Sequence, residues 1–176
     1  MVTDDVASEV DDRPPTTTLV RIVESAAGTT LESATEPTIV VGRDGTAGPA
    51  DRLPSVLADA ESIVGVVPRI ETSLSNRLGD AASAGLTARI VLTGRARRRL
   101  TGPIRSALRS RMADRGVDLY THDGDPPVGV LLVDDRAVVG LFDDEGLAAV
   151  LLTDDPAIRE WAVGVCRRYL DAGDPL

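Results

Sequence analysis

The N-terminal part of this 176-residue chain alternates between short apolar runs and stretches in which apolar residues recur at helical spacing. The runs are rich in β-branched residues and end at glycine, proline or polar residues, which is typical of buried strands. They predict strands at 38–41, 62–67, 86–92 and 117–120. The stretches with helical spacing predict helices at about 19–27, from the loop 42–48 to near Ala60, at 69–84 and at 94–115. The last of these is interrupted at Gly102-Pro103. Such alternation is typical of a parallel sheet.

The pattern changes after residue 127. Three apolar runs follow at 128–133, 137–141 and 147–152, separated only by acidic turns. Gaps this short allow hairpins but no crossover helix, so these strands are predicted to be antiparallel. A helix beginning near Pro156 then carries Ile158, Trp161 and Cys166 on or beside its apolar face. The predicted fold class is α/β, with a mixed sheet (parallel front, antiparallel C-terminal meander) and helices on both faces.

The length predicts a single domain. Residues 1–16 are acidic and then rich in proline and threonine, a composition typical of a disordered tail. The sequence therefore predicts a tail at 1–16 and one α/β domain at 17–176.

The basic residues are all arginine, and the chain contains no lysine, one histidine and one cysteine. This composition excludes a Schiff-base lysine and a phosphate-loop lysine. It also excludes zinc or iron–sulfur sites built from several nitrogen and sulfur ligands. We therefore expect no metal and no cofactor.

The net charge of −9 has two interpretations. An acidic domain repels nucleic acid and anionic membranes. Abundant aspartate, missing lysine and 2% aromatic residues are also typical of proteins from salt-accumulating halophiles. Above 1 M salt the Debye length is below ~3 Å, so an acidic surface reflects the solvent rather than a partner. We favour the halophilic interpretation, under which the acidic turns are solvated hairpin turns.

Cys166 has no second cysteine with which to form an internal disulfide, so nothing indicates an oxidising compartment. The N-terminus lacks the pattern of a signal peptide, and no apolar stretch approaches the ~20 residues needed to span a bilayer. We expect a cytoplasmic protein without a membrane partner.

Two parts of the chain resemble known domains. Residues 60–68 and 84–93 resemble the phospholipase-D-like core. The stretch from Gly129 through Asp134-Asp135, Phe142 and Asp154-Asp155-Pro156 to Trp161 is similar to the effector-sensing domain of archaeal winged-helix transcription regulators, the TrmB-like and FilR1-like group. The likeness covers about residues 50–175 and rests on the order and spacing of these segments.

The resemblance implies a phospholipase-D-like fold and a regulatory role. In that group a winged helix of roughly 70 to 90 residues precedes the sensor. Only about 50 residues precede the core here, without a helix-turn-helix pattern, so we expect no direct DNA binding from this chain alone. Enzymatic phospholipase-D relatives use a His-x-Lys pair. This chain has no lysine, and His122 is followed by Asp123-Gly124, so we expect a non-catalytic relative.

A regulatory domain of this class would bind a small-molecule effector at the carboxyl ends of its parallel strands. Arg69 lies at a predicted strand-to-helix junction, and His122 follows another strand. These residues are the candidate ligand-binding positions. The domain would act by binding the effector, by forming a homodimer, or by pairing with a regulator protein.

The segment Arg95–Arg115 is rich in arginine. Arg95, Arg97, Arg98 and Arg99 are candidates for binding an anion or a partner. The alternative is an amphipathic helix whose buried stripe is Leu100, Ile104, Leu108 and Met112, with the arginines pairing with the acidic surface. We favour this alternative, because a charge run is usually a solvated face. Two other functions stay open: a phosphodiesterase-type hydrolase on the same scaffold, and a nucleic-acid binder using this segment.

Overall fold

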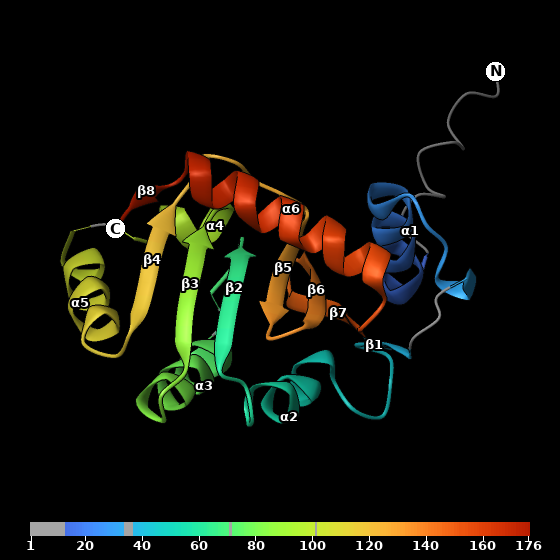
Figure 1. The fold of residues 1–176 in the computed structure, drawn as a ribbon, viewed down its shortest axis with the longest axis horizontal. Helices are drawn as coiled ribbons and strands as arrows, with labels where there is room; N and C mark the ends of the chain where they lie inside the picture. The colour runs from blue at the N-terminus through green and yellow to red at the C-terminus, as the bar shows by residue number, and fades with distance from the viewer. Residues whose placement is uncertain (1–12, 34–36, 71, 101) are drawn as a thin grey trace, which may run out of the picture.

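The computed structural model describes residues 13–33, 37–70, 72–100 and 102–176. Its centre is an eight-stranded mixed sheet with the order β1-β7-β6-β5-β2-β3-β4-β8 (Figure 1). The strands are β1 (Thr38–Gly42), β2 (Ser62–Val67), β3 (Thr87–Leu92), β4 (Val117–Thr121), β5 (Val128–Val133), β6 (Arg136–Asp143), β7 (Gly146–Thr153) and β8 (Asp174–Pro175).

The sheet has the two predicted parts. β2, β3 and β4 are parallel, whereas β5, β6 and β7 form an antiparallel meander that joins the parallel part through β2 and β5. The meander strands are buried along most of their length because helices cover both faces. The predicted mixed α/β fold is confirmed. The pairing of β1 with β7, and of β8 with β4, was not predicted.

Helices cover the two faces of the sheet in two separate groups. α1 (Pro15–Ala27) and α6 (Pro156–Ala172) pack on one face around Leu19, Val66, Leu151 and Ile158. The opposite face carries α2 (Leu53–Leu57), α3 (Thr72–Ser83), α4 (Gly94–Arg98) and α5 (Gly102–Ala113). Figure 1 shows α6 crossing the sheet in front of the central strands.

α6 begins at a well-formed cap. The carboxylate of Asp155 accepts hydrogen bonds from the backbone N–H groups of Ala157 (3.1 Å) and Ile158 (3.2 Å). Cys166 is buried on the inner face of this helix, as the sequence predicts. Burial in apolar surroundings raises the pKa of its thiol to about 12.

Two predicted helices differ in the structure. The helix expected to end near Ala60 is a 3₁₀ turn at Pro49–Arg52 followed by the short α2. α1 begins at Pro15, inside the predicted tail, because proline is well suited to a first helical position. The rest of that tail, residues 1–12, lies outside the described residues.

The arginine-rich segment divides into α4 and α5, with Gly102 at φ 50° in the break, which confirms the interruption predicted at Gly102-Pro103. The prediction that Ile104 is buried is wrong: this side chain is 61% exposed. The restart at Gly102-Pro103 breaks the continuous helical face that would have aligned Ile104 with Leu100. Leu100 is buried, and α5 contacts the core through Leu108 and Met112.

Candidate functional site

The loops that follow the parallel strands meet at one edge of the sheet. The backbone N–H of Thr93 donates to the carbonyl oxygen of Val67 (3.1 Å), and that of His122 donates to Leu92 (3.0 Å). The turn between β6 and β7 lies at the same edge, because β5 runs antiparallel to β2 and β6 runs antiparallel to β5. Loops from both parts of the sheet therefore gather where ligands bind in open α/β sheets.

Arg69 lies in the loop after β2 and reaches the β6–β7 turn. Its Nη1 donates to the backbone carbonyl of Asp143, and its Nη2 lies 3.9 Å from Oδ1 of Asp144. Arg95, at the start of α4, donates from Nη2 to the same Oδ1 at 3.1 Å. Two guanidinium groups thus share one carboxylate, whose side chain is 92% exposed.

A hollow of about 340 Å³ lies between these groups. Its lining consists of Arg69, Ile70, Arg95, Arg99, Asp144, Glu145 and Gly146. Within the described part of the chain, Arg99 has no ion-pair partner, and Glu145 is engaged by Arg43 (Nη1 to Oε2, 2.9 Å). The hollow therefore has an excess of positive charge, although the whole chain carries −9.

Arg43 holds the β6–β7 turn from the other side. Its guanidinium donates to both carboxylate oxygens of Asp143, at 2.8 and 2.9 Å. Asp143 Oδ1 also accepts a hydrogen bond from the backbone N–H of Glu145 (2.9 Å). The hydrogen bonds from Arg43 lower the pKa of Asp143 to about 2, and the charge of Arg69 acts in the same direction. The turn is therefore fixed between two arginines from distant loops.

His122 lies in the loop after β4, as predicted, but it does not line the hollow that contains Arg69. Its Nδ1 accepts a hydrogen bond from the backbone N–H of Gly124 (2.8 Å). Its ring packs edge-to-face on Tyr169 of α6, with 4.6 Å between the ring centroids. These contacts stabilise the loop and its packing against α6.

The arginines in and next to α4 lie in two different regions of the structure. Arg97 pairs with Asp123 (2.7 Å), and Arg98 lies 3.8 Å from Asp125, so both contact the loop that holds His122. Arg95 and Arg99 line the hollow instead. Arg95, Arg97 and Arg98 pair with acidic groups, as the amphipathic interpretation predicts, whereas Arg99 is left without such a partner in the described structure.

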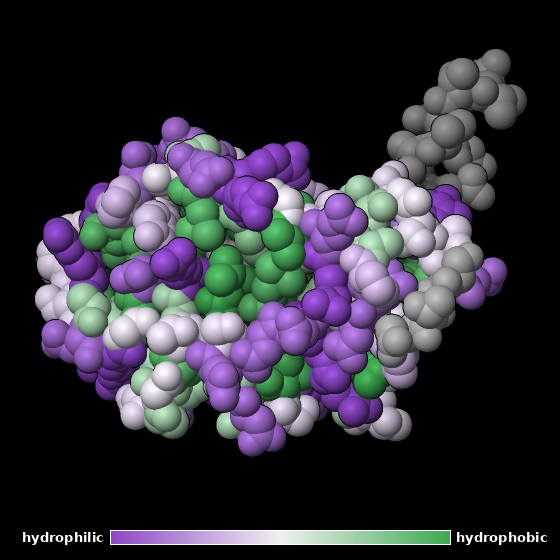
Figure 2. All heavy atoms as spheres, in the orientation of Figure 1, coloured by the Kyte–Doolittle hydropathy of each residue, from purple (hydrophilic) through white to green (hydrophobic). Residues whose placement is uncertain are grey.

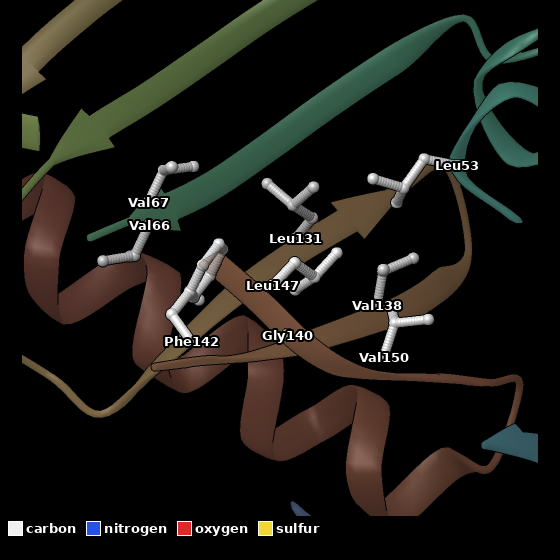
Figure 3. Close-up of a pocket in the computed structure, with 10 residues that line it drawn as sticks. Leu53, Val66, Val67, Leu131, Val138, Gly140, Phe142, Leu147 and Val150 are labelled. Atoms are coloured by element: carbon white, nitrogen blue, oxygen red, sulfur yellow. The ribbon is translucent and has the colours of Figure 1, made fainter. Parts of the chain in front are cut away.

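An apolar cavity of about 30 Å³ lies beneath the β6–β7 turn. Figure 3 shows side chains of β2 and of the meander strands directed into one shared space, with Phe142 at one end. Its lining residues are Leu53, Val66, Val67, Gly129, Leu131, Val138, Gly140, Phe142, Leu147 and Val150. Phe142 and Leu147 are paired across β6 and β7, next to a bulge at Leu141/Phe142.

The sequence analysis named Arg69, Arg95 and Arg99, which line the hollow. It did not name Arg43, Asp143 and Asp144. The acidic turn was interpreted as a solvated hairpin, and Arg43 lies in a glycine-rich loop 100 positions away from Asp143. One sequence signal could have found them. The acidic turn between two antiparallel strands lies at the same edge of the predicted sheet as the arginines that follow the parallel strands.

Among the described residues, no group of three or more His, Cys, Asp or Glu side chains is arranged to hold a metal ion. In the same part of the chain, no helix combines the length and apolar character needed to cross a bilayer.

Solved structures share this fold at low sequence identity. TrmBL2, an archaeal chromatin protein, is 17% identical with a TM-score of 0.61, and the match covers 81% of this chain and 56% of TrmBL2. Nuc of Salmonella typhimurium, a phospholipase D family member, is 18% identical with a TM-score of 0.62 over 80% of this chain and 98% of Nuc. NucT from Helicobacter pylori is 13% identical with a TM-score of 0.62, covering 80% and 99% of the two chains.

No curated protein has a significant sequence match to the chain. The family model of the middle domain of the methanogenesis regulatory protein FilR1, in contrast, matches residues 47–172. This match runs from the turn before α2 to the end of α6 and includes the strands β2 to β7. The chain therefore belongs to the FilR1 middle-domain family, a regulator-associated family, and has a phospholipase-D-like fold.

Proposed function

We propose that this domain is a non-catalytic sensor that binds a small anionic effector in the hollow lined by Arg69, Arg95 and Arg99. The observation that carries the proposal is the sharing of Asp144 between Arg69 and Arg95. An ion pair with a carboxylate this exposed contributes only about 0–1 kcal/mol, so an incoming anion can replace it at little cost. Arg99 supplies a further cation.

The ligand chemistry follows from the guanidinium groups. Arginine is suited to carboxylate and phosphate because its planar fork donates two parallel hydrogen bonds. A small oxyanion in the hollow would accept from Arg95 and Arg99 and take the place of Asp144. We therefore assign the effector to the oxyanions, which include carboxylates and phosphate monoesters.

The absence of lysine and the surroundings of His122 support a non-catalytic role. The sequence offers no His-x-Lys pair, and the Nδ1 of its one histidine already accepts a backbone hydrogen bond. The rival function is phosphodiester hydrolysis. We expect no turnover of bis(p-nitrophenyl) phosphate by the purified chain in molar salt. Turnover that co-purifies with the chain and disappears in His122→Ala would overturn the non-catalytic proposal.

Isothermal titration with inorganic phosphate and with acetate tests the anion site. We expect the wild-type chain to bind at least one of these ions, and Arg95→Gln and Arg99→Gln each to weaken binding about tenfold. Loss of one charge-assisted hydrogen bond, worth about 1.5–3 kcal/mol, accounts for this effect. Arg111→Gln on α5 is the matched control, because Arg111 is exposed and does not line the hollow. Absence of binding by either ion, or equal binding by all variants, would contradict the proposal.

We further propose that the domain pairs with a second copy of itself through the face of the sheet below α6. In Figure 1 the lower parts of β2, β3 and β4 have no helix in front of them, and Figure 2 shows hydrophobic atoms gathered over this region. A groove of about 460 Å³ runs between this face and α6. Its apolar lining includes Val64, Leu132 and Val163, and Val163 is 41% exposed.

The charges around this groove are balanced, in contrast to the acidic chain as a whole. Arg89 of β3 is paired in register with Asp118 of β4, and Arg167 and Asp171 lie four residues apart on α6. A two-fold interface brings the same patch of both copies together. A patch with both signs can then place each arginine against an aspartate of the other copy, which favours self-pairing.

Sedimentation equilibrium over a range of protein concentrations tests this pairing. We expect a dimer that Val163→Glu converts to a monomer, because the new carboxylate would be buried in the interface. Glu160→Gln, also exposed on α6, is the control and should leave the dimer intact. A wild-type chain that is monomeric at every concentration would exclude self-pairing and would favour pairing with a separate regulator protein.

A further inference from the structure

We infer that the effector of this domain is an amphiphilic oxyanion: a carboxylate or phosphate monoester that carries a short, methyl-terminated alkyl group. The oxyanion binds the arginines of the hollow, and the alkyl group enters the apolar cavity beneath Phe142. This inference rests on the proposed anion site and adds to it the chemistry of the rest of the ligand.

The hollow and the cavity are neighbours along two segments of the chain. In the β6–β7 hairpin, Phe142 and Leu147 line the cavity, and the turn residues between them, Asp144 to Gly146, line the hollow. At the end of β2, Val67 lines the cavity and Arg69 lines the hollow. The two spaces therefore lie on either side of one turn, within reach of one small molecule.

The cavity is suited to hydrocarbon and not to water. All of its lining side chains are apolar, and its volume of about 30 Å³ is that of one water molecule in the liquid or of a methyl group. Apolar cavities stay dry because a water molecule there would lack hydrogen-bond partners. A methyl-terminated group can occupy the same space and gain the transfer free energy of each buried carbon.

Phe142 covers one end of the cavity and lies close to the backbone of two glycines. A Cβ atom added to Gly129 would lie 3.2 Å from Cε2 of Phe142, and one added to Gly140 would lie 3.5 Å from the same atom. The ring therefore packs closely on two glycines. Displacement of the ring does not require the separation of interlocked side chains at these positions.

The anion site controls the segment that carries Phe142. The next residue, Asp143, has its carboxylate held by Arg43 and its carbonyl oxygen held by Arg69. An oxyanion that draws Arg69 and Arg95 away from the turn releases one of its two anchors. Phe142 can then move outward, and the alkyl group of the same ligand can enter. Anion binding and alkyl binding are therefore coupled.

A titration series of wild-type protein separates the two parts of the ligand. Acetate is compared with propionate, and inorganic phosphate with methyl phosphate. We expect the longer member of each pair to bind about fourfold more tightly, which corresponds to one buried methyl group. A preference in only one pair would identify the oxyanion, carboxylate or phosphate, that the hollow recognises.

Two variants test whether the cavity causes this preference. Val138→Ile adds one methylene to a lining side chain and should reduce the preference to less than twofold, with acetate or phosphate binding unchanged. Phe142→Ala enlarges the cavity and should shift the preference to a longer chain, with hexanoate binding more tightly than propionate. Val117→Ile, at a buried position outside the cavity, is the control for overpacking.

The outcomes distinguish this inference from the anion site itself. Equal binding of the members of each pair, with both weakened by Arg95→Gln, would overturn the alkyl site and leave the anion site standing. A preference for propionate over acetate that Val138→Ile leaves unchanged would also overturn it. Absence of binding by every ligand in the series would overturn both proposals.

Discussion

Arg43 and Asp143, which lie 100 positions apart in the sequence, form a bidentate ion pair. The Nη1–Oδ2 distance is 2.8 Å and the Nη2–Oδ1 distance is 2.9 Å. The pair joins the loop after the edge strand β1 to the turn between β6 and β7. That turn lines the candidate anion site on one side and carries Phe142 over the apolar cavity on the other. One interaction thus positions the elements of both proposed subsites.

The Asp143 pair predicts a specific dependence of stability on pH. Because the folded-state pKa is lowered from 3.8 to about 2, the pair stabilises the fold above pH 4 and loses this contribution as the pH falls toward 2. Both side chains are more than a third exposed, so the contribution at neutral pH is about 1 kcal/mol or less. Urea unfolding of wild type and Asp143→Asn at pH 2 to 6 measures it.

We expect the free energies of unfolding of these two proteins to differ above pH 4 and to converge near pH 2. Asp135→Asn is the control, because Asp135 is 94% exposed in the other hairpin turn and lies 3.5 Å from its arginine partner. If the free energies of unfolding of wild type and Asp143→Asn differ by the same amount at every pH in this range, the charge of the carboxylate does not contribute to stability.

Thr93 offers a position where a polar group reduces stability. Its side chain is fully buried, and its hydroxyl oxygen has no hydrogen-bond partner among the described residues. Thr93→Val keeps the shape and removes the unsatisfied hydroxyl, so we expect a gain of about 1 kcal/mol, or roughly 2–4 °C in melting temperature. Calorimetry checks this value. Thr93→Ser keeps the hydroxyl and loses a methyl group, and it should melt below wild type; a less stable Thr93→Val would contradict the expectation.

Gly65 and Gly164 predict opposite effects of the same substitution. At Gly65 in β2, a Cβ atom would overlap Leu131 and lie 2.9 Å from the carbonyl oxygen of Val130, so Gly65→Ala should cost about 1–3 kcal/mol. Nothing lies within 4 Å of a Cβ at Gly164, on the outer side of α6, so Gly164→Ala should add about 1 kcal/mol. Denaturant unfolding of both variants provides the comparison. Equal effects of the two substitutions would show that β2 and β5 do not approach as described.

The arginine-rich segment is expected not to bind DNA. Arg97 and Arg98 face Asp123 and Asp125, and the chain as a whole is strongly acidic. Fluorescence anisotropy with a labelled duplex at 0.1 M salt should show no binding, because electrostatic binding would be strongest at low salt. If binding occurs and Arg105→Glu with Arg109→Glu abolishes it, α5 is a nucleic-acid surface after all.

The sequence by itself determined the sheet and the place of its loops. Buried runs such as 62–67 and 128–133 are apolar at nearly every position, and the chain length between successive runs decides whether a crossover helix fits. These local properties predict both the parallel part and the meander, and they place Arg69 and Arg95 at strand ends. Helix bounds were less predictable where Pro15 and Pro49 act through single backbone positions, whereas the break at Gly102-Pro103 was predicted.

Only the tertiary structure decided which residues meet at the site. Arg43 reaches Asp143 because β1 pairs with β7, and no local pattern shows that an early strand joins the far edge of the meander. Ile104 is exposed because a break rotates α5, and His122 contacts Tyr169 rather than the hollow. The physical reason is that hydrophobic periodicity reports how deeply each segment is buried, whereas the neighbours of a charged side chain depend on how distant segments pack.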